Sequence, residues 1–342
     1  MEIKKIECKR CLSSYPETLI PTSDQVCVYC QADEAEQEMV PAEKEETPTS
    51  PPPLSQEEAA QRELALRALA RKHMLPFVER FNNDYMAGWV HKDICQRLDK
   101  FSQDVEDKKS PRLMLFMPPR HGKSTLASIA FPAWHLGKNP RHEFISCSYS
   151  GSLAMSFSRK VRQMLREPNY RNIFAGTLLD RTSQSVEAGV GGGITGKGAN
   201  ILVIDDPVKN REDAESEFNR ESVWNWYTST AYTRLAPGGG VLIILTRWHD
   251  DDLAGRLLTM AEKGADQWEV VKYPAVAEKD EEFRKTGDAL HPERYNVDAL
   301  AQIQKAVGPR DWSALYQQNP VSNEGDYFTR DMIRYYDDED LD

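Results

Sequence analysis

Residues 112–130 constrain the fold of this chain more than any other stretch. They begin with a short apolar run at 112–117, which predicts a buried strand, and end in small and apolar residues that predict a helix. Gly122, Lys123 and Ser124 stand between the two. A strand end followed at once by a loop and a helix N-terminus presents backbone N–H groups and a positive dipole to an anion. The order therefore predicts a phosphate-binding loop.

The loop departs from the G-x-x-x-x-G-K-[ST] pattern of nucleotide-binding proteins. Met117 stands where the pattern has glycine, and two prolines follow it, which removes two N–H donors. Arg120 can supply positive charge in their place. The alternative is a chance Gly-Lys-Ser, but the flanking strand and helix favour a functional loop. The expected nucleotide-binding residues here are Pro119, Arg120, His121, Gly122, Lys123, Ser124 and Thr125.

A second apolar strand, at residues 201–204, ends in Asp205 and Asp206 about eighty residues after the loop. An uninterrupted apolar run is typical of a central parallel strand, and its carboxyl end is where such sheets bind ligands. We expect Asp205 and the Ser124 hydroxyl to hold Mg²⁺, and Asp206 to orient and deprotonate an attacking water. Lys123 would reach the β- and γ-phosphates. Together the two stretches predict a P-loop NTPase of α/β fold that binds ATP.

A third apolar strand, at residues 240–246, ends in Thr246, followed by Arg247. A polar residue at the tip of a strand beside the nucleotide strand is suited to sense the γ-phosphate, so Thr246 is a further candidate catalytic residue. Arg247 could sit near the phosphate as well. Asp252 is expected to cap the next helix through Arg256.

The net charge of −11 is unevenly distributed. Residues 33–58 contain nine acidic side chains and one lysine, and residues 337–342 contain five more acids. These stretches together carry −13, so the rest of the chain carries +2 and its acidity does not argue against contact with DNA. No apolar run reaches membrane-spanning length, and no signal-peptide core follows the first residues. We therefore expect a soluble intracellular protein without a membrane partner.

Four of the six cysteines form two C-x2-C pairs with fifteen residues between them. This spacing can place four thiolates around a tetrahedral Zn²⁺. A pair of disulfides is the alternative, but no secretion signal supports an oxidising compartment. The expected zinc ligands are Cys8, Cys11, Cys27 and Cys30, whereas Cys95 and Cys147 stand in apolar surroundings that predict core positions.

These features divide the chain into four parts. Residues 1–32 form the zinc-ribbon-like module, and residues 33–54 an acidic, proline-rich linker. The P-loop ATPase domain is expected at residues 55–320, beginning with a helix whose capping box pairs Ser55 with Glu58. Residues 321–342 are a linker or tail, since their clustered acids have no predicted strand to position them.

Several segments in the same order resemble the ATPase half of a tailed-phage or prophage terminase large subunit. They are M-P-P-R-H-G-K-S, I-T-G-K-G-A-N-I-L-V-I-D-D-P, W-N-W-Y, T-R-L-A-P-G-G, T-R-W-H-D-D-D-L-A-G-R-L and A-L-Y-Q-Q-N-P. The resemblance covers residues 75–336 and implies a P-loop fold of the additional-strand type with a mainly parallel sheet. It also implies a motor that hydrolyses ATP to move double-stranded viral DNA into a procapsid, in the host cytoplasm.

The resemblance assigns roles residue by residue. Lys123 and Ser124 match the Walker A pair, Arg120 the basic residue of that loop, Asp205 the Walker B carboxylate and Thr246 the coupling position. Asp206 matches the catalytic acid, but it stands where glutamate is common, which shortens its reach. The implied partners are a portal ring, a small terminase subunit and further copies of the chain in a ring.

Family members carry a nuclease domain after the ATPase, and we expect no nuclease activity in this chain. The acids at 337–342 are better explained as a solvated tail than as a two-metal site. Two other functions stay open. One is a zinc-ribbon docking adaptor in which the nucleotide site only regulates assembly, and the other is a helicase-like DNA translocase. DNA-stimulated turnover and strand separation distinguish them from the packaging motor.

Overall fold

A computed structural model describes residues 55–82, 85–177 and 198–320, together with the backbone of 5–7, 14–16 and 186–189. The four cysteines of the expected zinc site, the acidic linker and the tail at 321–342 lie outside the described residues. The chain divides into two compact units, Met1–Arg67 and Ala68–Asp342. No helix in the described ranges is long and apolar enough to cross a membrane.

The first unit contains two short strands and the start of a helix. Strands β1 (Lys5–Glu7) and β2 (Ser14–Pro16) pair antiparallel. Helix α2 (Gln56–Lys72) begins at the expected capping box. The Glu58 N–H donates to the Ser55 hydroxyl at 3.2 Å, and the Ser55 N–H donates to the Glu58 carboxylate at 2.9 Å. This prediction is confirmed.

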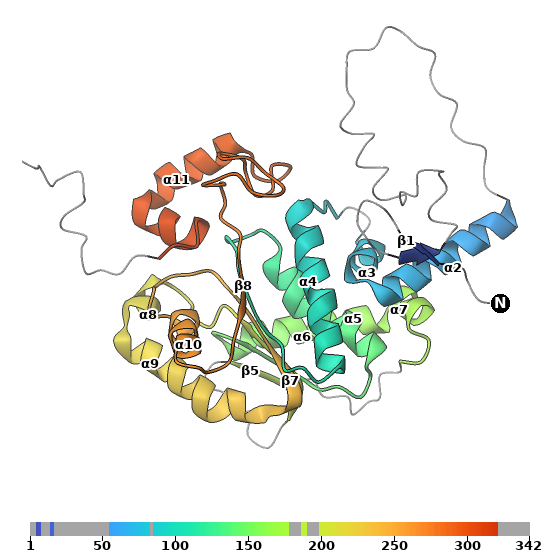
Figure 1. The fold of residues 1–342 in the computed structure, drawn as a ribbon, viewed down its shortest axis with the longest axis horizontal. Helices are drawn as coiled ribbons and strands as arrows, with labels where there is room; N and C mark the ends of the chain where they lie inside the picture. Colours follow the sequence, from blue (N-terminus) through green and yellow to red (C-terminus); the bar gives the residue numbers. More distant parts are fainter. Residues whose placement is uncertain are drawn as a thin grey trace, which may run out of the picture. The chain divides into compact units, whose positions relative to one another are not determined.

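The second unit is built on a six-stranded sheet in which every neighbouring pair is parallel (Figure 1). Its order is β5 (Val186–Gly189), β4 (Phe144–Ser148), β6 (Ala199–Asp205), β7 (Leu235–Leu245), β3 (Arg112–Phe116) and β8 (Glu269–Lys272). Strand β7 lies between β3, which leads into the phosphate-binding loop, and β6, which ends in the two carboxylates. This inserted strand is the feature of the additional-strand fold, so the predicted fold class is confirmed.

Helices cover both faces of the sheet (Figure 1). On one face, the core contains side chains of α3 (Met74–Phe81), α4 (Trp89–Glu106), α5 (Phe131–Lys138), α6 (Gly151–Arg166) and α7 (Pro168–Ile173). The other packs against α9 (Glu217–Trp226) and α10 (Leu253–Glu262), while the short α8 (Arg211–Glu215) precedes α9. Parallel strands need such double coverage because both of their faces must be removed from water.

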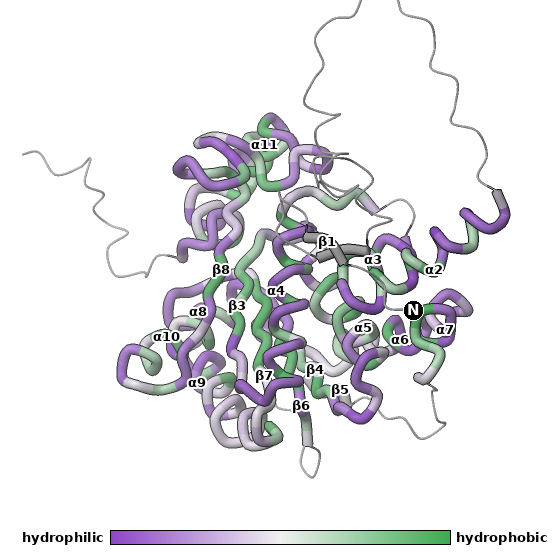
Figure 2. The backbone as a smooth tube through the Cα atoms, turned by 45° about the vertical axis from the view of Figure 1, so that its right-hand side comes forward, coloured by the Kyte–Doolittle hydropathy of each residue, from purple (hydrophilic) through white to green (hydrophobic). Residues whose placement is uncertain are grey.

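Successive side chains of each strand point to opposite faces of the sheet and so contribute alternately to the two cores. Leu113 and Leu115 of β3 belong to the core under α4, and Met114 and Phe116 belong to the core under α9 and α10. Figure 2 shows β3 and β7 as hydrophobic stretches among helices of mixed hydropathy. Each fully buried large aliphatic side chain contributes roughly 1.5–3 kcal/mol. Cys95 and Cys147 are 1 % and 2 % exposed, which confirms their predicted core positions.

The helix after the phosphate-binding loop has an unusual first turn. Residues Thr125–Ala130 are π-helical, with the Phe131 N–H bonded to the Leu126 carbonyl, and α5 continues from there. All of these residues after Thr125 are buried. Wide turns of this kind are frequent at functional sites. The sequence predicted the helix but not its widened turn.

The chain after β8 forms a smaller helical subdomain with a core of its own. Helix α11 (Val297–Asp311) is broken at Gly308, whose φ is +80°, and is followed by the π-helical turn η5 (Trp312–Tyr316). Leu300 and Trp312 pack there with alanines of the loop that follows β8. We call residues 274–318 the C-terminal subdomain.

Candidate nucleotide-binding site

The ends of β3, β6 and β7 meet at the carboxyl edge of the sheet, and a surface pocket opens there. It is lined by residues that follow all three strands, and also by Arg294 of the C-terminal subdomain. The lining contains six of the seven loop residues expected to bind the nucleotide, and both Asp206 and Thr246. It consists of Pro119, Arg120, Gly122, Lys123, Ser124, Thr125, Tyr149, Asp206, Val208, Lys209, Thr246, Trp248 and Arg294.

Lys123 lies at the centre of the edge. Its side chain is only 8 % exposed, and its ammonium group is 3.1 Å from the Asp206 carboxylate. The same group donates a hydrogen bond to the Thr246 hydroxyl. A buried ammonium needs such partners because desolvating an unpaired charge is costly. The three predicted residues therefore contact one another, and Lys123 holds the tips of β6 and β7 to the loop.

Asp205 faces the helix that follows the loop. Its carboxylate accepts hydrogen bonds from Ser124 at 3.1 Å and from Ser128 at 2.6 Å. Burial, and secondarily the charge of Asp206, raises the pKa of Asp205, while the two serines and Lys123 lower it. The ionised form of Asp205 is therefore disfavoured by burial, and the neighbouring serines and Lys123 offset only part of this cost.

These oxygens suit a magnesium ion. Mg²⁺ prefers octahedral oxygen ligands at about 2.0–2.1 Å, so two adjacent ligands lie roughly 3 Å apart. The Ser124 hydroxyl and the nearer Asp205 oxygen are 3.1 Å apart. A bound divalent cation would also offset the cost of burying the Asp205 charge. The residues present fit the expected ion.

Asp206 is held at the strand tip by backbone bonds. Its N–H donates to the Ile244 carbonyl at 2.9 Å, and its carboxylate accepts from the Thr246 N–H at 2.8 Å. Its φ of +44° places it in the left-handed region, which is uncommon for residues other than glycine. This conformation turns the side chain, 28 % exposed, towards the pocket. A carboxylate so placed can accept a proton from a water in the pocket.

The irregular loop sequence has a structural explanation at two positions. Met117, which replaces the first glycine of the pattern, is fully buried in the core under α4, so its side chain does not obstruct the pocket. Gly122 has a φ of +88°, which a glycine adopts readily. Arg120 also has a positive φ, +67°, and its exposed side chain lines the pocket. The predicted cationic position is therefore at the pocket wall.

His121 differs from its neighbours in the loop. Its ring is 1 % exposed, bonds the Pro119 carbonyl at 2.9 Å and packs on Tyr295, with 5.0 Å between ring centres. It is not among the residues that line the pocket. Any contact of His121 with a nucleotide would have to come from its backbone.

The expectation for Arg247 is wrong. Its side chain turns away from the pocket, donates to Asp252 at 2.6 Å and is 7 % exposed. Asp252 does cap α10, by accepting the Gly255 N–H at 2.9 Å, and its carbonyl accepts the Arg256 backbone N–H at 3.0 Å, but the Arg256 side chain is not its partner. Arg256 instead pairs with Asp251 at 2.8 Å.

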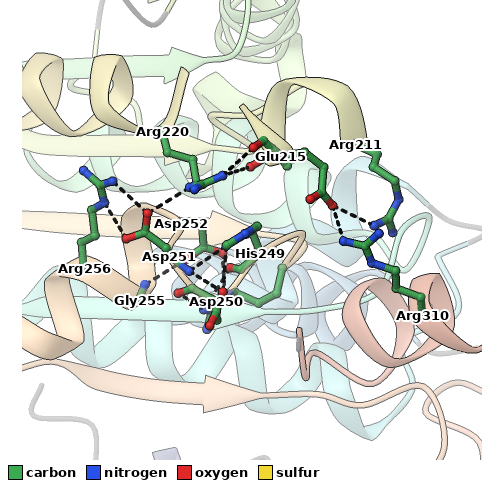
Figure 3. Close-up of polar contacts among 12 residues, drawn as sticks. Arg211, Glu215, Arg220, His249, Asp250, Asp251, Asp252, Gly255, Arg256 and Arg310 are labelled. Carbon is green, nitrogen blue, oxygen red and sulfur yellow. Dashed lines mark hydrogen bonds and ion pairs between the residues drawn. The ribbon is translucent and has the colours of Figure 1, made fainter. Parts of the chain in front are cut away.

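Figure 3 shows how these charges are arranged. Asp251 lies between Arg256 and Arg220, which is 2.9 Å away. In a second group, Glu215 of α8 lies between Arg211 and Arg310, which joins α8 to the C-terminal subdomain. These cations are engaged by carboxylates outside the phosphate-binding loop.

Sequence reasoning missed several residues of the site. Ser128 follows Ser124 by four positions and so shares its helix face, a signal that could have identified it. Tyr149 and Trp248 each follow a sheet strand, β4 and β7, within a few residues, which is another usable signal. Arg294 lies about 170 residues after the loop and no local pattern marks it.

The phosphate-binding loop, the two aspartates and Thr246 all lie within a stretch that matches a known protein family. The family model described as "Terminase large subunit, T4likevirus-type, N-terminal" matches residues 114–335, which is more than half of the chain. No curated protein sequence matches.

The similar solved structures include two phage large terminases. The large terminase of bacteriophage HK97 is 15 % identical, with 65 % of this chain and 50 % of that chain covered and a TM-score of 0.41. The large terminase of a thermophilic bacteriophage, solved in complex with ADP, is 10 % identical, with 63 % and 51 % covered and a TM-score of 0.35. The chain thus spans about half the length of each. On the family match, the chain belongs to the T4-like terminase large subunits and corresponds to their N-terminal part.

Proposed function

We propose that this chain is the ATP-hydrolysing motor part of a terminase large subunit and moves double-stranded viral DNA into a procapsid. The observation that supports this most is the convergence of Lys123, Asp205, Asp206 and Thr246 at one edge of the sheet. A cation, two carboxylates and a hydroxyl are the groups that phosphoryl transfer requires, since its catalysis is chiefly positioning and electrostatic stabilisation.

Each residue has a proposed role. Lys123 and Arg120 stabilise the charge that develops on the transferred phosphoryl group. Asp206 orients the attacking water and accepts its proton. Thr246 contacts the γ-phosphate end of the site, where it already shares the Lys123 ammonium with Asp206. Ser124 and Asp205 hold Mg²⁺, which supplies a Lewis acid for the phosphate oxygens when it is bound.

The proposed partners follow from the family. They are double-stranded DNA, a portal ring, a small terminase subunit and further copies of this chain in a ring, all in the host cytoplasm. A second proposal concerns Cys8, Cys11, Cys27 and Cys30, whose spacing supports one structural Zn²⁺. Elemental analysis of the purified protein should find one zinc per chain, lost in a Cys8→Ser, Cys11→Ser variant.

Phosphate release with and without duplex DNA tests the motor proposal. Lys123→Ala should abolish turnover while the protein stays folded. Lys263→Ala is the matched control, because this lysine is exposed at the end of α10 and does not line the pocket. Turnover that DNA stimulates supports a motor. Nucleotide binding without DNA-stimulated turnover would favour the docking adaptor, and separation of duplex strands would favour a helicase-like translocase.

A further inference from the structure

A buried histidine of α4 contacts the back of the phosphate-binding loop. His91 is 3 % exposed, and its Nδ1 is 3.1 Å from the Gly88 N–H. Because that backbone group can only donate, Nδ1 must be the acceptor, and the ring proton is therefore on Nε2. Nε2 is 3.1 Å from the carbonyl oxygen of His121 and donates to it. The bond from the Gly88 N–H fixes the tautomer, and this tautomer allows Nε2 to donate to the His121 carbonyl.

The loop needs support at this point. Its two prolines cannot donate backbone hydrogen bonds, and two of its next three residues, Arg120 and Gly122, have positive φ. For a non-glycine residue such as Arg120 this conformation costs roughly 1 kcal/mol or more, and it persists only where surrounding contacts enforce it. His91 approaches closely enough that a β-carbon on Gly122 would lie 3.4 Å from Nε2.

The surroundings of His91 keep its ring neutral. Its ring meets the edge of His291 with 4.6 Å between ring centres, and Tyr85 at 5.6 Å. Burial lowers the pKa of His91 to about 4, and His291 and Arg294 contribute to this lowering, against the opposing charge of Glu293. The imidazole is therefore neutral throughout the physiological range.

We propose that His91 is a positioning residue for the phosphate-binding loop. Its hydrogen bond fixes the His121 carbonyl behind the loop, and so fixes the direction in which Arg120 and the backbone from Gly122 onwards face the pocket. The effect on nucleotide affinity rests on the proposed function, whereas the effect on loop order does not. The nucleotide itself never contacts His91, which is not among the residues that line the pocket.

The chain offers a matched control in His135 of α5. It is also fully buried, and its ring packs on Phe131 and Phe144 of the core under α4. Its two ring nitrogens bond the Ser102 hydroxyl at 2.8 Å and His142 at 2.9 Å. Neither bond involves the phosphate-binding loop. A substitution there should destabilise the fold by a comparable amount without loosening the loop.

The experiment compares His91→Phe, His91→Gln and His135→Phe. Phenylalanine keeps the ring volume without the donor, and glutamine restores an N–H donor at similar reach. Hydrogen exchange of the peptide at 117–130, without nucleotide, should accelerate in His91→Phe and return towards wild type in His91→Gln. Affinity for a fluorescent ADP analogue should fall roughly tenfold in His91→Phe, the worth of about one hydrogen bond. His135→Phe should change neither quantity.

Three results would overturn the proposal: unchanged loop exchange in folded His91→Phe, no recovery in His91→Gln, or equal loosening of the loop in His135→Phe. The last would show that general destabilisation explains the effect. If the wild-type chain binds no nucleotide, the proposed function fails instead, and the exchange comparison still decides the role of His91.

Discussion

Replacing Asp206 by asparagine should separate nucleotide binding from hydrolysis. In the structure the Lys123 ammonium is 3.1 Å from the Asp206 carboxylate, and it must exchange this partner for phosphate oxygens when a nucleotide binds. The carboxylate thus competes with the ligand for its main cation. An asparagine has the same shape and can still accept the Thr246 N–H, so the strand tip should keep its conformation.

The size of the effect follows from the exposure of the pair. A hydrogen bond to a charged group contributes roughly 1.5–3 kcal/mol. Asp206 is 28 % exposed, and solvent screening reduces the value towards about 1–1.5 kcal/mol. Asp206→Asn should therefore bind ATP roughly tenfold more tightly than wild type. Because the variant lacks the base, hydrolysis should fall by about a hundredfold or more.

Fluorescence titration with an ATP analogue and single-turnover phosphate release measure the two quantities separately. Asp250→Asn is a suitable control, since Asp250 is exposed near the same edge but does not line the nucleotide pocket. Normal hydrolysis by Asp206→Asn would refute the assignment of Asp206 as the base. Weaker ATP binding than wild type would refute the competition argument.

Three further predictions concern stability. Burial lowers the pKa of His91 to about 4 and that of His135 to about 3, so the unfolded chain takes up protons before the folded chain does as the pH falls. The free energy of unfolding should therefore be at its full value above the ordinary histidine pKa near 6.5, and each histidine should lower it by roughly 2 kcal/mol between pH 7 and pH 5. Equal unfolding free energies from urea titrations at the two pH values would contradict this. Ser128→Ala removes a 2.6 Å bond to the buried aspartate that ends β6, so its unfolding free energy should fall by about 2 kcal/mol at pH 7, and an unchanged denaturation midpoint would count against that bond. Gly255→Ala would place a β-carbon 1.8 Å from the Asp250 carbonyl oxygen near the start of α10, so thermal unfolding should show a loss of about 3 kcal/mol or more in stability. The control is Gly176→Ala, whose β-carbon meets no atom within 4 Å and which should leave the stability unchanged.

The sheet could be predicted where burial on both faces leaves an uninterrupted apolar run. Strand β6 is such a case, because its residues 201–204 are all fully buried. Strand β7 was predicted only from Gly240, but it begins at Leu235. Its first half contains proline and glycines, which local propensity disfavours in strands. The Leu235 end nevertheless pairs with Ala199 of β6, so tertiary contact overrides propensity there.

The site was predictable where chemistry coincides with a strand end. Lys123 and the two aspartates follow such ends, and the sheet brings them together. The orientation of Arg247 was not predictable in the same way. It follows the same strand as Thr246, but a buried bond with Asp252 draws it to the start of α10, and only the fold decides between the two partners. Position on a strand tip gives proximity to the pocket without giving the direction of the side chain.

The charge of the pocket is a further property that supports the proposed nucleotide ligand, and it could not be seen in the composition. The whole chain carries −11, yet the pocket wall presents four cationic side chains, those of Arg120, Lys123, Lys209 and Arg294. Asp206 in the wall and Asp205 beside it bring the local sum to about +2 when both are ionised. A nucleoside triphosphate with one Mg²⁺ carries about two net negative charges. The described pocket is therefore complementary in charge to the magnesium complex of a nucleoside triphosphate. The Asp206→Asn substitution makes the pocket wall more positive by one charge, and it should tighten nucleotide binding for this reason as well.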